Sequence, residues 1–371
     1  MCKRIFKNET SDGGDIPFYK IGTFGGEPDA YISRELFEEY KKKFSYPNEG
    51  DILLSASGTI GRIVEYTGED AYFQDSNIVW LSHDKSICNK FLKVLYPTVK
   101  WDGIEGSTIK RLYNDNFLKT QFMMPKIEEQ ERLGEYFEQL DHLITLHQRK
   151  YNKLLNVKKS MLEKMFPKNG SNIPEIRFKG FTDPWEQRKL KEILIQRTEH
   201  QKISDDAPLL AFSYAEGVIS PEDKKSNKRD FIMTDKYNKI FSRTELNDII
   251  YNPANVVHGA IHRNKLGTGV VSPIYKIFMC NGVSPKFIGE RLHTDKFILE
   301  VTKFIEGTVV KLRTLSPEMF LEMSIEIPKS YEEQDRIGTY FTNLDNLITL
   351  HQRELEKLQN IKKSMLEKMF V

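Results

Sequence analysis

The stretch EQERLGEYFEQLDHLITLHQRKYNKLLNVKKSMLEKMF at residues 129–166 returns as EQDRIGTYFTNLDNLITLHQRELEKLQNIKKSMLEKMF at residues 333–370. The two copies lie 204 positions apart, and 27 of their 38 positions are identical. A Pro-Lys pair precedes each copy, at residues 125–126 and 328–329. Identity of this degree within one chain is not chance, and it indicates that both copies do the same job.

Both copies have the apolar spacing of a long helix, which at about 1.5 Å per residue would span about 57 Å. Heptad position a holds Leu133, Leu140, His147, Leu154 and Met161 in the first copy, and Ile337, Leu344, His351, Leu358 and Met365 in the second. Position d holds Tyr136, Leu143 and Val157, and then Tyr340, Leu347 and Ile361. The pattern predicts a coiled-coil pair, although two ordinary bundle helices would show a similar stripe.

Apolar residues at position e widen this stripe beyond a two-helix seam, so we expect further helices to pack against it. The predicted partner-helix interface consists of Leu140, Leu143, Ile144, His147, Leu344, Leu347, Ile348 and His351. A buried polar residue at position a commonly sets the register of a coiled coil, and we assign this role to the two histidines. A ligand or pH-switch role for them is the alternative.

The segments before the two helices differ in sequence and have mixed α and β character. Short apolar runs at residues 51–55, 78–81, 269–275 and 276–280 predict strands, and residues 32–44 and 286–304 have helical character. Two faint echoes link the segments: GDIL at residue 50 with NDII at 247, and EGSTIKRL at 105 with EGTVVKLR at 306. The first helix ends at Pro167, and PKNGSN at 167–172 forms a hinge.

Length, composition and charge indicate the number of domains and the expected location of the chain. A chain of 371 residues corresponds to two or three domains, and 39% hydrophobic residues can build cores. Lys and Arg number 55 against 53 Asp and Glu, so bulk charge argues neither for nor against a nucleic-acid partner. No apolar run approaches 18 residues, and the opening MCKRIFKNETSDGGD does not read as a signal peptide, so we expect no membrane span and a cytoplasmic location.

The sequence contains no catalytic signature that holds. Cys2, Cys88 and Cys280 have no CxxC spacing, so neither a disulfide framework nor a zinc site is expected. No GxxxxGK[ST] phosphate loop occurs, and SASGTIG at 55–61 reads as a tight turn. NPAN at 252–255 lacks the second Pro and the aromatic residue of the adenine-methyltransferase tetrad. We therefore expect no catalytic residues, no metal and no cofactor in this chain.

The layout as a whole resembles the specificity (S) subunit of type I restriction–modification systems. The resemblance rests on the two helices with their EQxR[LI]G beginning, the LDxLITLHQR core and the KKSMLEKMF ending. The segment PEIRFKGFTDPWEQRKL at 174–190 is similar to the opener of a target-recognition domain in this family, and we call it the opener segment. The opener segment has no counterpart in front of the first half, which leaves the edge of domain one undefined.

The resemblance implies an α+β fold with two mixed α/β target-recognition domains separated by two long antiparallel coiled-coil helices, with pseudo-two-fold symmetry. The expected parts are the first recognition domain at 1–124, the first spacer helix at 125–166, the linker and opener at 167–190, the second recognition domain at 191–327 and the second spacer helix at 328–371.

The family role implied is the reading of a bipartite, asymmetric site in double-stranded DNA. The expected partners are two adenine-methyltransferase (M) subunits, which hold S-adenosylmethionine, together with motor-nuclease (R) subunits where the host has them. A second interpretation stays open: an orphan or decoy S-like adaptor that binds methyltransferase subunits without reading DNA. An enzyme in its own right is the least favoured class.

Polar and basic residues of the two variable halves are the DNA-contact candidates, because Arg and Lys bind guanine edges or phosphates and Asn pairs with adenine. In the first half they are Ser57, Thr59, Arg62, Ser107, Thr108, Lys110, Arg111 and Tyr113. In the second half they are Lys224, Lys225, Lys228, Arg229, Asn255, His258, His262, Arg263, Asn264, Lys311 and Arg313.

Overall fold

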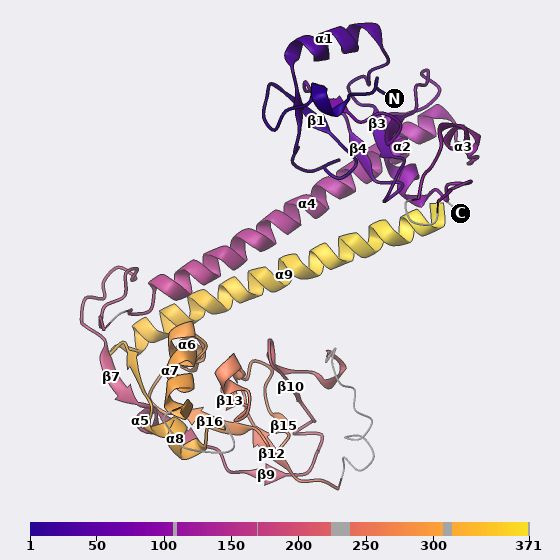
Figure 1. Ribbon diagram of the computed structural model, residues 1–371. Helices are drawn as coiled ribbons and strands as arrows, with labels where there is room; N and C mark the ends of the chain where they lie inside the picture. Colours follow the sequence, from indigo (N-terminus) through magenta and orange to yellow (C-terminus); the bar gives the residue numbers. More distant parts are fainter. Residues whose placement is uncertain (107–109, 169, 224–237, 307–313, 370–371) are drawn as a thin grey trace. The chain divides into compact units, whose positions relative to one another are not determined.

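The computed structural model describes residues 1–106, 110–168, 170–223, 238–306 and 314–369. The chain divides into two compact units. Unit 1 comprises Met1–Gln148 and Arg353–Val371, and unit 2 comprises Arg149–Gln352. Each unit contains a mixed α and β part and a section of both long helices (Figure 1).

Unit 1 is built on two small sheets. Strand β3 is central to an antiparallel sheet of order β4-β3-β6, and β1 lies between β2 and β5 in the other. All four residues of β3 are buried, and aromatic side chains fill the core around them. The elements are η1 (Lys7–Glu9), β1 (Ile16–Tyr19), β2 (Tyr31–Ile32), α1 (Arg34–Lys43), β3 (Ile52–Ser55), β4 (Ile63–Glu65), β5 (Tyr72–Phe73), β6 (Ile78–Trp80), α2 (Asn89–Leu95), η2 (Tyr96–Thr98) and α3 (Asn114–Lys119).

Unit 2 contains a four-stranded antiparallel sheet of order β14-β13-β16-β8, with smaller sheets β15-β12-β9, β10-β11 and β17-β7. The elements are β7 (Glu186–Lys189), α5 (Leu190–Ile193), β8 (Leu194–Gln196), β9 (His200–Gln201), β10 (Ala211–Ser213), β11 (Gly217–Ile219), η3 (Pro221–Asp223), β12 (Phe241–Thr244), β13 (Ile249–Tyr251), η5 (Val256–His258), β14 (Ile261–Arg263), β15 (Gly269–Val271), β16 (Lys276–Cys280), α6 (Pro285–Leu292), α7 (Asp295–Glu306), α8 (Pro317–Glu322) and β17 (Ser324–Ile327).

The two sequence copies form helices α4 (Ile127–Lys164) and α9 (Tyr331–Met369). Within each unit they run antiparallel and are joined by an ion pair at repeat-equivalent positions. In unit 2 Lys158 Nζ lies 2.5 Å from Asp345 Oδ1, and in unit 1 Lys362 Nζ lies 2.5 Å from Asp141 Oδ1. Lys362 is the repeat equivalent of Lys158, and Asp345 is that of Asp141, so the two pairs exchange their members between the helices, as pseudo-two-fold symmetry requires. The predicted α+β fold with antiparallel long helices is confirmed.

The register of the apolar stripe differs from the predicted a/d pattern. Leu143 and Leu347, both assigned to position d, are 42% and 45% exposed. The residues that face inward alternate between positions a and e. Position e lies four residues after a, and the next a lies three residues after e, so these positions also follow one face of the helix. In α4 the buried or half-buried residues of this stripe are Phe137, Leu140, Ile144, His147, Tyr151 and Leu154. Placing Leu143 and Leu347 in the seam was therefore wrong, whereas Leu140, Ile144, Leu344 and Ile348 do face inward.

The first turns of each long helix dock on a short helix of the mixed α and β part. In unit 1 the Gln130 side-chain oxygen accepts a hydrogen bond of 2.9 Å from the backbone N–H of Cys88, and its amide nitrogen donates to the Pro125 carbonyl at 2.9 Å. Gln334 does the same in unit 2, accepting from the Ser284 N–H at 2.9 Å and donating to the Pro328 carbonyl at 2.8 Å. Both glutamines are buried, so these bonds satisfy groups that have little access to water.

A glycine four residues later lets the helices touch. A Cβ on Gly134 would lie 2.7 Å from the Lys90 Cβ and 3.0 Å from the Phe91 nitrogen in α2. A Cβ on Gly338 would lie 2.5 Å from the Lys286 Cβ and 2.6 Å from the Phe287 nitrogen in α6. Only glycine permits this approach of backbone to backbone. The EQxR[LI]G motif is thus the docking face of each long helix.

The two units share a frame that their sequences barely show. Asp51 and Asp248 are both buried, and each accepts a hydrogen bond at its Oδ2 from the N–H three residues earlier, at 2.9 and 2.7 Å. The residues before them, Gly50 and Asn247, have positive φ angles of 88° and 75°, which Gly and Asn tolerate. The faint GDIL and NDII echo therefore marks one corner that occurs in both units.

We predict that Gly134→Ala destabilises unit 1 by about 2 kcal/mol, because the added methyl overlaps the α2 backbone. On an open helix face the same change would stabilise by up to about 1 kcal/mol, so the sign is diagnostic. Gly22→Ala is the matched control, since a Cβ there meets nothing within 4 Å. Urea denaturation of both variants measures the difference, and an unchanged or raised midpoint for Gly134→Ala would contradict the docking.

Candidate nucleic-acid interface

A tight turn in unit 1 brings most of its described DNA-contact candidates together. The turn joins β3 to β4 and is held by the Ser55 hydroxyl, which donates to the Thr59 carbonyl at 2.5 Å and accepts from the Arg62 N–H at 2.9 Å. The Gly58 N–H donates to the Lys110 carbonyl at 2.9 Å. Residues 56–62 and 110–113 therefore form one continuous surface, which we call the turn surface of unit 1.

The turn surface carries three exposed cations. Arg62, Lys110 and Arg111 are exposed, and within the described part of the chain none of them forms an ion pair. Tyr113 adds a ring that is 49% exposed, and Thr59 adds an exposed hydroxyl. Cations outside ion pairs can bind phosphates or base edges without first breaking such a pair. Ser57 is the exception among the candidates, because it is only 5% exposed and has little surface to offer.

In unit 2 the loop after β13 occupies the corresponding place. The Asn252 side chain accepts from the Ala254 N–H at 3.1 Å, and the Leu315 N–H donates to the Pro253 carbonyl at 3.1 Å. The matching contact in unit 1 is the Leu112 N–H to the Ala56 carbonyl at 2.8 Å. Asn255 and His258 are exposed on this loop.

Tyr214 extends this exposed loop. Its hydroxyl donates to the His258 carbonyl, and its ring is 56% exposed. We call Tyr214, Asn255 and His258 the loop surface of unit 2. Sequence reasoning missed Tyr214, because nothing in its neighbourhood distinguishes it from other tyrosines.

Two further DNA-contact candidates in unit 2 form hydrogen bonds within the fold instead of facing solvent. Asn264 has no exposed surface, and its side chain bonds Thr244, Leu266 and Gly267, so the prediction that it contacts DNA is wrong. Arg263 donates to the Asn247 side chain at 2.7 Å and to the Thr342 hydroxyl of α9 at 3.4 Å. Burial lowers the pKa of Arg263. A lowered pKa is typical of an arginine packed inside the fold rather than of a solvated residue that contacts DNA.

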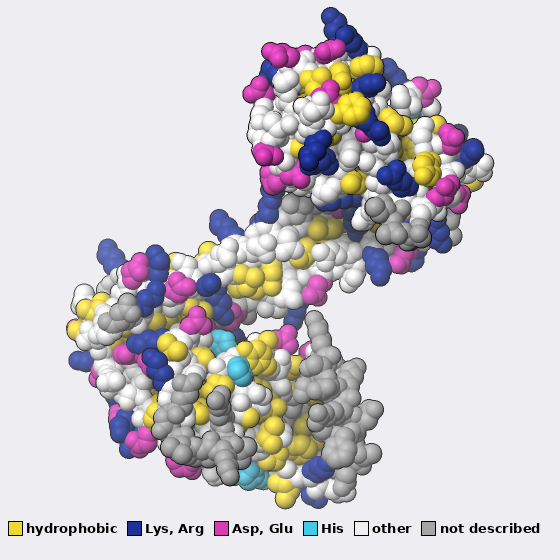
Figure 2. Space-filling view, viewed as in Figure 1, with side chains coloured by type: hydrophobic (Ala, Val, Ile, Leu, Met, Phe, Trp, Pro, Cys, Tyr) yellow, Lys and Arg dark blue, Asp and Glu magenta, His cyan; other side chains and the backbone are white. Residues whose placement is uncertain are grey.

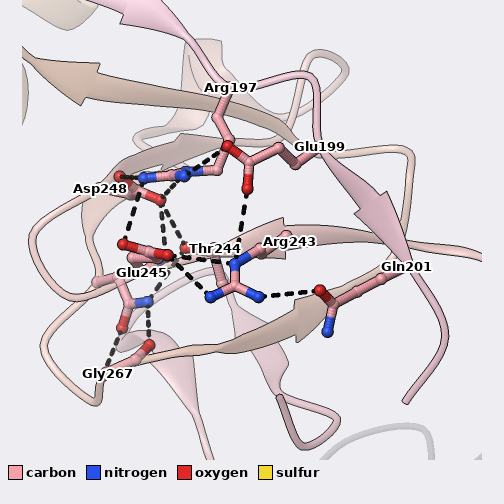
Figure 3. A network of polar contacts seen from close by, with 9 residues as sticks. Arg197, Glu199, Gln201, Arg243, Thr244, Glu245, Asp248 and Gly267 are labelled. Atoms are coloured by element: carbon pink, nitrogen blue, oxygen red, sulfur yellow. Dashed lines mark hydrogen bonds and ion pairs between the residues drawn. The ribbon is translucent and has the colours of Figure 1, made fainter. Parts of the chain in front are cut away.

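A polar network beside Asn264 explains this burial (Figure 3). The Arg197 guanidinium binds both carboxylate oxygens of Asp248, at 2.8 and 3.2 Å, and also pairs with Glu199. Arg243 pairs with Glu245 and donates to Gln201 at 3.0 Å. Both arginines face carboxylates, so this network ties the strand corners together and leaves no cation for phosphate binding.

Several candidates lie outside the described residues: Ser107, Thr108, Lys224, Lys225, Lys228, Arg229, Lys311 and Arg313. On the face shown in Figure 2, Lys and Arg are interspersed with Asp and Glu over unit 1 rather than gathered in one patch. Such a surface favours reading by a few local contacts over broad electrostatic binding.

Among the described residues there is no cluster of three His, Cys, Asp or Glu able to hold a metal. Burial raises the pKa of the Cys2 and Cys280 thiols to about 12, so both are protonated at neutral pH. None of the described helices is sufficiently long and apolar to span a bilayer.

The structure thus defines a duplicated α+β protein with one frame, two unlike sets of loops and two copies of one helix. Residues 1–156 match the family described as "Type I restriction modification DNA specificity domain". The predicted resemblance to specificity subunits of type I restriction–modification systems is confirmed.

Two relatives share this description. The chain is 58% identical over 149 residues to a Haemophilus influenzae protein named for a type I restriction enzyme specificity subunit, a match that covers 39% of each chain. It is 22% identical over 340 residues to the specificity subunit of the type I restriction enzyme MjaVIII of Methanocaldococcus jannaschii, covering 86% of this chain and 75% of the relative.

A solved structure shows the same fold. The type I restriction–modification S subunit from M. genitalium superposes with a TM-score of 0.59 at 14% identity, over all of this chain and 92% of that one. The fold prediction and the sequence resemblance therefore agree.

We predict that His262 makes unit 2 sensitive to acid. Burial, with His293 at a ring distance of 4.7 Å, lowers its pKa from about 6.5 to about 4. The unfolded chain then binds this proton more tightly than the folded one, so the stabilisation is complete above about pH 6.5 and is lost as the pH falls to about 4. The free energy of unfolding should drop by up to about 3 kcal/mol over this window.

The measurement is urea denaturation from pH 7 to pH 4 for the wild type and for His262→Gln. The variant should lose part of the pH dependence, whereas His258→Gln, at an exposed position, should keep it. Equal slopes for His262→Gln and the wild type would contradict the assignment.

Proposed function

We propose that this chain is the DNA-reading subunit of a type I restriction–modification complex. In this proposal each unit reads one half of a bipartite, asymmetric site. The observation that carries the proposal is that both units share one frame while their loops differ. The aspartate corners and the glutamine docking contacts are equivalent in the two units, and they support surfaces of different chemistry.

The two surfaces would read different bases. The turn surface of unit 1 offers Arg62, Lys110 and Arg111, which suit guanine edges and phosphates. The loop surface of unit 2 offers the amide of Asn255, which suits adenine, beside the ring of Tyr214. Two unlike half-sites are the expected result.

The near-identical helix copies support two copies of one partner, which we assign as adenine-methyltransferase subunits. Each copy leaves two leucines of its LITL segment on the surface: Leu143 and Leu146 are 42% and 38% exposed, and Leu347 and Leu350 are 45% and 52% exposed. Apolar side chains exposed at equivalent places are suited to burial by equivalent partner surfaces.

Shallow hollows on the two long helices also repeat. One is lined by Arg149, Lys153, Asn156, Val157, Ser160 and Met161 of α4, and the other by their equivalents 204 residues later in α9. In this proposal S-adenosylmethionine and the methyl-transfer residues belong to the partner subunits, and motor-nuclease subunits join the complex where the host has them. The chain itself contributes recognition and scaffolding.

The DNA-reading proposal predicts that each unit controls one half of the recognised motif. The complex with its methyltransferase subunits is used to select from randomised DNA. Arg62→Ala or Arg111→Ala should relax one half, and Asn255→Ala with His258→Ala should relax the other. Each lost base contact should weaken binding by roughly 5- to 150-fold, and a lost phosphate contact should lower the salt dependence by about one ion.

Lys42→Ala, at an exposed position on α1, is the control and should change neither half. If the selected DNA shows no two-part motif, or if both sets of variants affect the same half, the proposal is wrong. Stable binding of methyltransferase subunits without any selected DNA would instead favour the adaptor role.

The partner assignment predicts that Leu143→Asp leaves the chain folded and reduces the bound methyltransferase subunits from two to one. Leu347→Asp should act in the same way, and the double variant should bind none. Leu140→Asp is the matched comparison, because Leu140 is only 6% exposed and a buried carboxylate should lower the melting temperature. Light scattering of the purified complexes gives the stoichiometry, and two subunits bound to Leu143→Asp would exclude this docking site.

A further inference from the structure

The two units share a loop whose equivalence is not visible in the sequence. In unit 1 Phe18 of β1 pairs in parallel with Tyr72 of β5. In unit 2 Leu209 forms the equivalent parallel bridge with Val270 of β15. The next loop along the chain lies against the same strand of the frame in both units. We call this loop the crossing loop, residues 20–26 in unit 1 and residues 214–217 in unit 2.

A glycine brings each crossing loop onto an equivalent strand residue. Gly25 has a φ of 74°, and a Cβ there would lie 3.0 Å from the Val64 Cγ2 of β4. Gly217 has a φ of 77°, and a Cβ there would lie 2.6 Å from the His262 Cβ of β14. Val64 and His262 are equivalent, because each pairs with the residue two positions after the buried corner aspartate. The positive φ and the close approach both require glycine.

The crossing loop borders the candidate DNA surface in each unit. In unit 1 a Cβ on Gly25 would lie 3.6 Å from the Nε and Nη2 atoms of Arg62, which belongs to the turn surface. In unit 2 His262 Nε2 donates to the Tyr214 carbonyl at 2.9 Å, and the Tyr214 hydroxyl donates to the His258 carbonyl. The crossing loop therefore continues the turn surface of unit 1 and the loop surface of unit 2.

The two crossing loops offer different chemistry. Phe24 in unit 1 is 1% exposed, so that loop buries its aromatic ring and leaves glycine backbone outside. In unit 2 the loop is the end of the hairpin formed by β10 and β11, and residues 214–216 are all exposed there. We call residues 214–216 the hairpin tip. Its Tyr214 ring is 56% exposed, and Glu216 forms no ion pair with any residue that the structure describes.

The hairpin has a form that suits the major groove of DNA. Strands β10 and β11 make a two-stranded antiparallel ribbon, and a ribbon of this kind fits that groove. Phe212 and Val218 are 6% and 5% exposed and anchor the two strands in the core of unit 2. The hairpin tip is thus held on a fixed support while its side chains face outward.

We propose that the hairpin tip of unit 2 reads base edges, with Tyr214 and Glu216 as specificity-determining residues. This inference rests on the proposed function and deepens it. The Glu216 carboxylate accepts a hydrogen bond from the amino group of cytosine, which is the base that a carboxylate suits. The Tyr214 ring packs on the neighbouring base. Phosphates repel a carboxylate, so an exposed glutamate here is suited to a base edge rather than to the DNA backbone.

The test uses the complete complex with its methyltransferase subunits and selects from randomised DNA. The wild-type motif should contain a C·G pair at one position of the half that Asn255→Ala with His258→Ala relaxes. Glu216→Gln should change the preference at that position to an A·T pair, because an amide both donates and accepts, as the adenine edge requires. The other half of the motif should stay unchanged.

Tyr214→Ala should weaken binding to the selected DNA by about 5- to 150-fold, because the contact between ring and base is lost. Tyr214→Phe keeps the ring and should bind as the wild type does, which separates the ring from its hydrogen bond to His258. Asp206→Asn is the matched control for Glu216→Gln, since it neutralises an exposed carboxylate of the same unit, and it should change neither half. All four variants should melt at the wild-type temperature.

A two-part motif that Glu216→Gln and Tyr214→Ala leave unchanged would overturn this inference while the proposed function stands. The same holds if Glu216→Gln alters the half that unit 1 reads, or if both variants lose affinity without any change in the preferred bases. In that last case the hairpin tip contacts only the DNA backbone. Absence of any two-part motif would overturn both proposals together, so the two failures are distinguishable.

Discussion

The structure depends on the contact between the first turns of each long helix and the short helix on which it docks. Gln130 and Gln334 replace water at buried backbone groups, and Gly134 and Gly338 remove the side chain that would keep the helices apart. A glutamine and a glycine four positions apart lie on one helix face, so a single turn supplies both the polar and the steric fit. This contact sets where each long helix starts relative to its mixed α and β part, and thereby the position of the residues further along that helix.

The same constraint explains how the two units can diverge and still share a frame. A buried aspartate holds the corner before the central strand in each unit, and a residue with positive φ precedes it. Loops outside this frame are less constrained by packing, since their side chains face solvent. Function can therefore change at the turn surface of unit 1 and the loop surface of unit 2 without loss of the fold.

Sequence reasoning located the candidate surfaces but did not sort the residues within them. Arg62, Lys110 and Arg111 are exposed as expected, whereas Asn264 lies inside a turn that connects two sheets. Both outcomes come from polar residues next to short strands, and one sequence offers no signal to separate them. The Arg197 and Asp248 pair, 51 residues apart, creates the polar interior that accommodates Asn264.

The duplicated helices, their length and the mixed class of the rest were determined by the sequence alone, because a near-identical repeat with helical periodicity leaves few alternatives. Their antiparallel pairing was expected only from the family resemblance. Which side of each helix faces inward was decided only by tertiary structure. Apolar residues occupy positions a, d and e, and in the middle of the helices packing covers positions a and e, which leaves Leu143 and Leu347 in solvent. Periodicity counts apolar positions, but only the neighbouring elements decide which of them are covered.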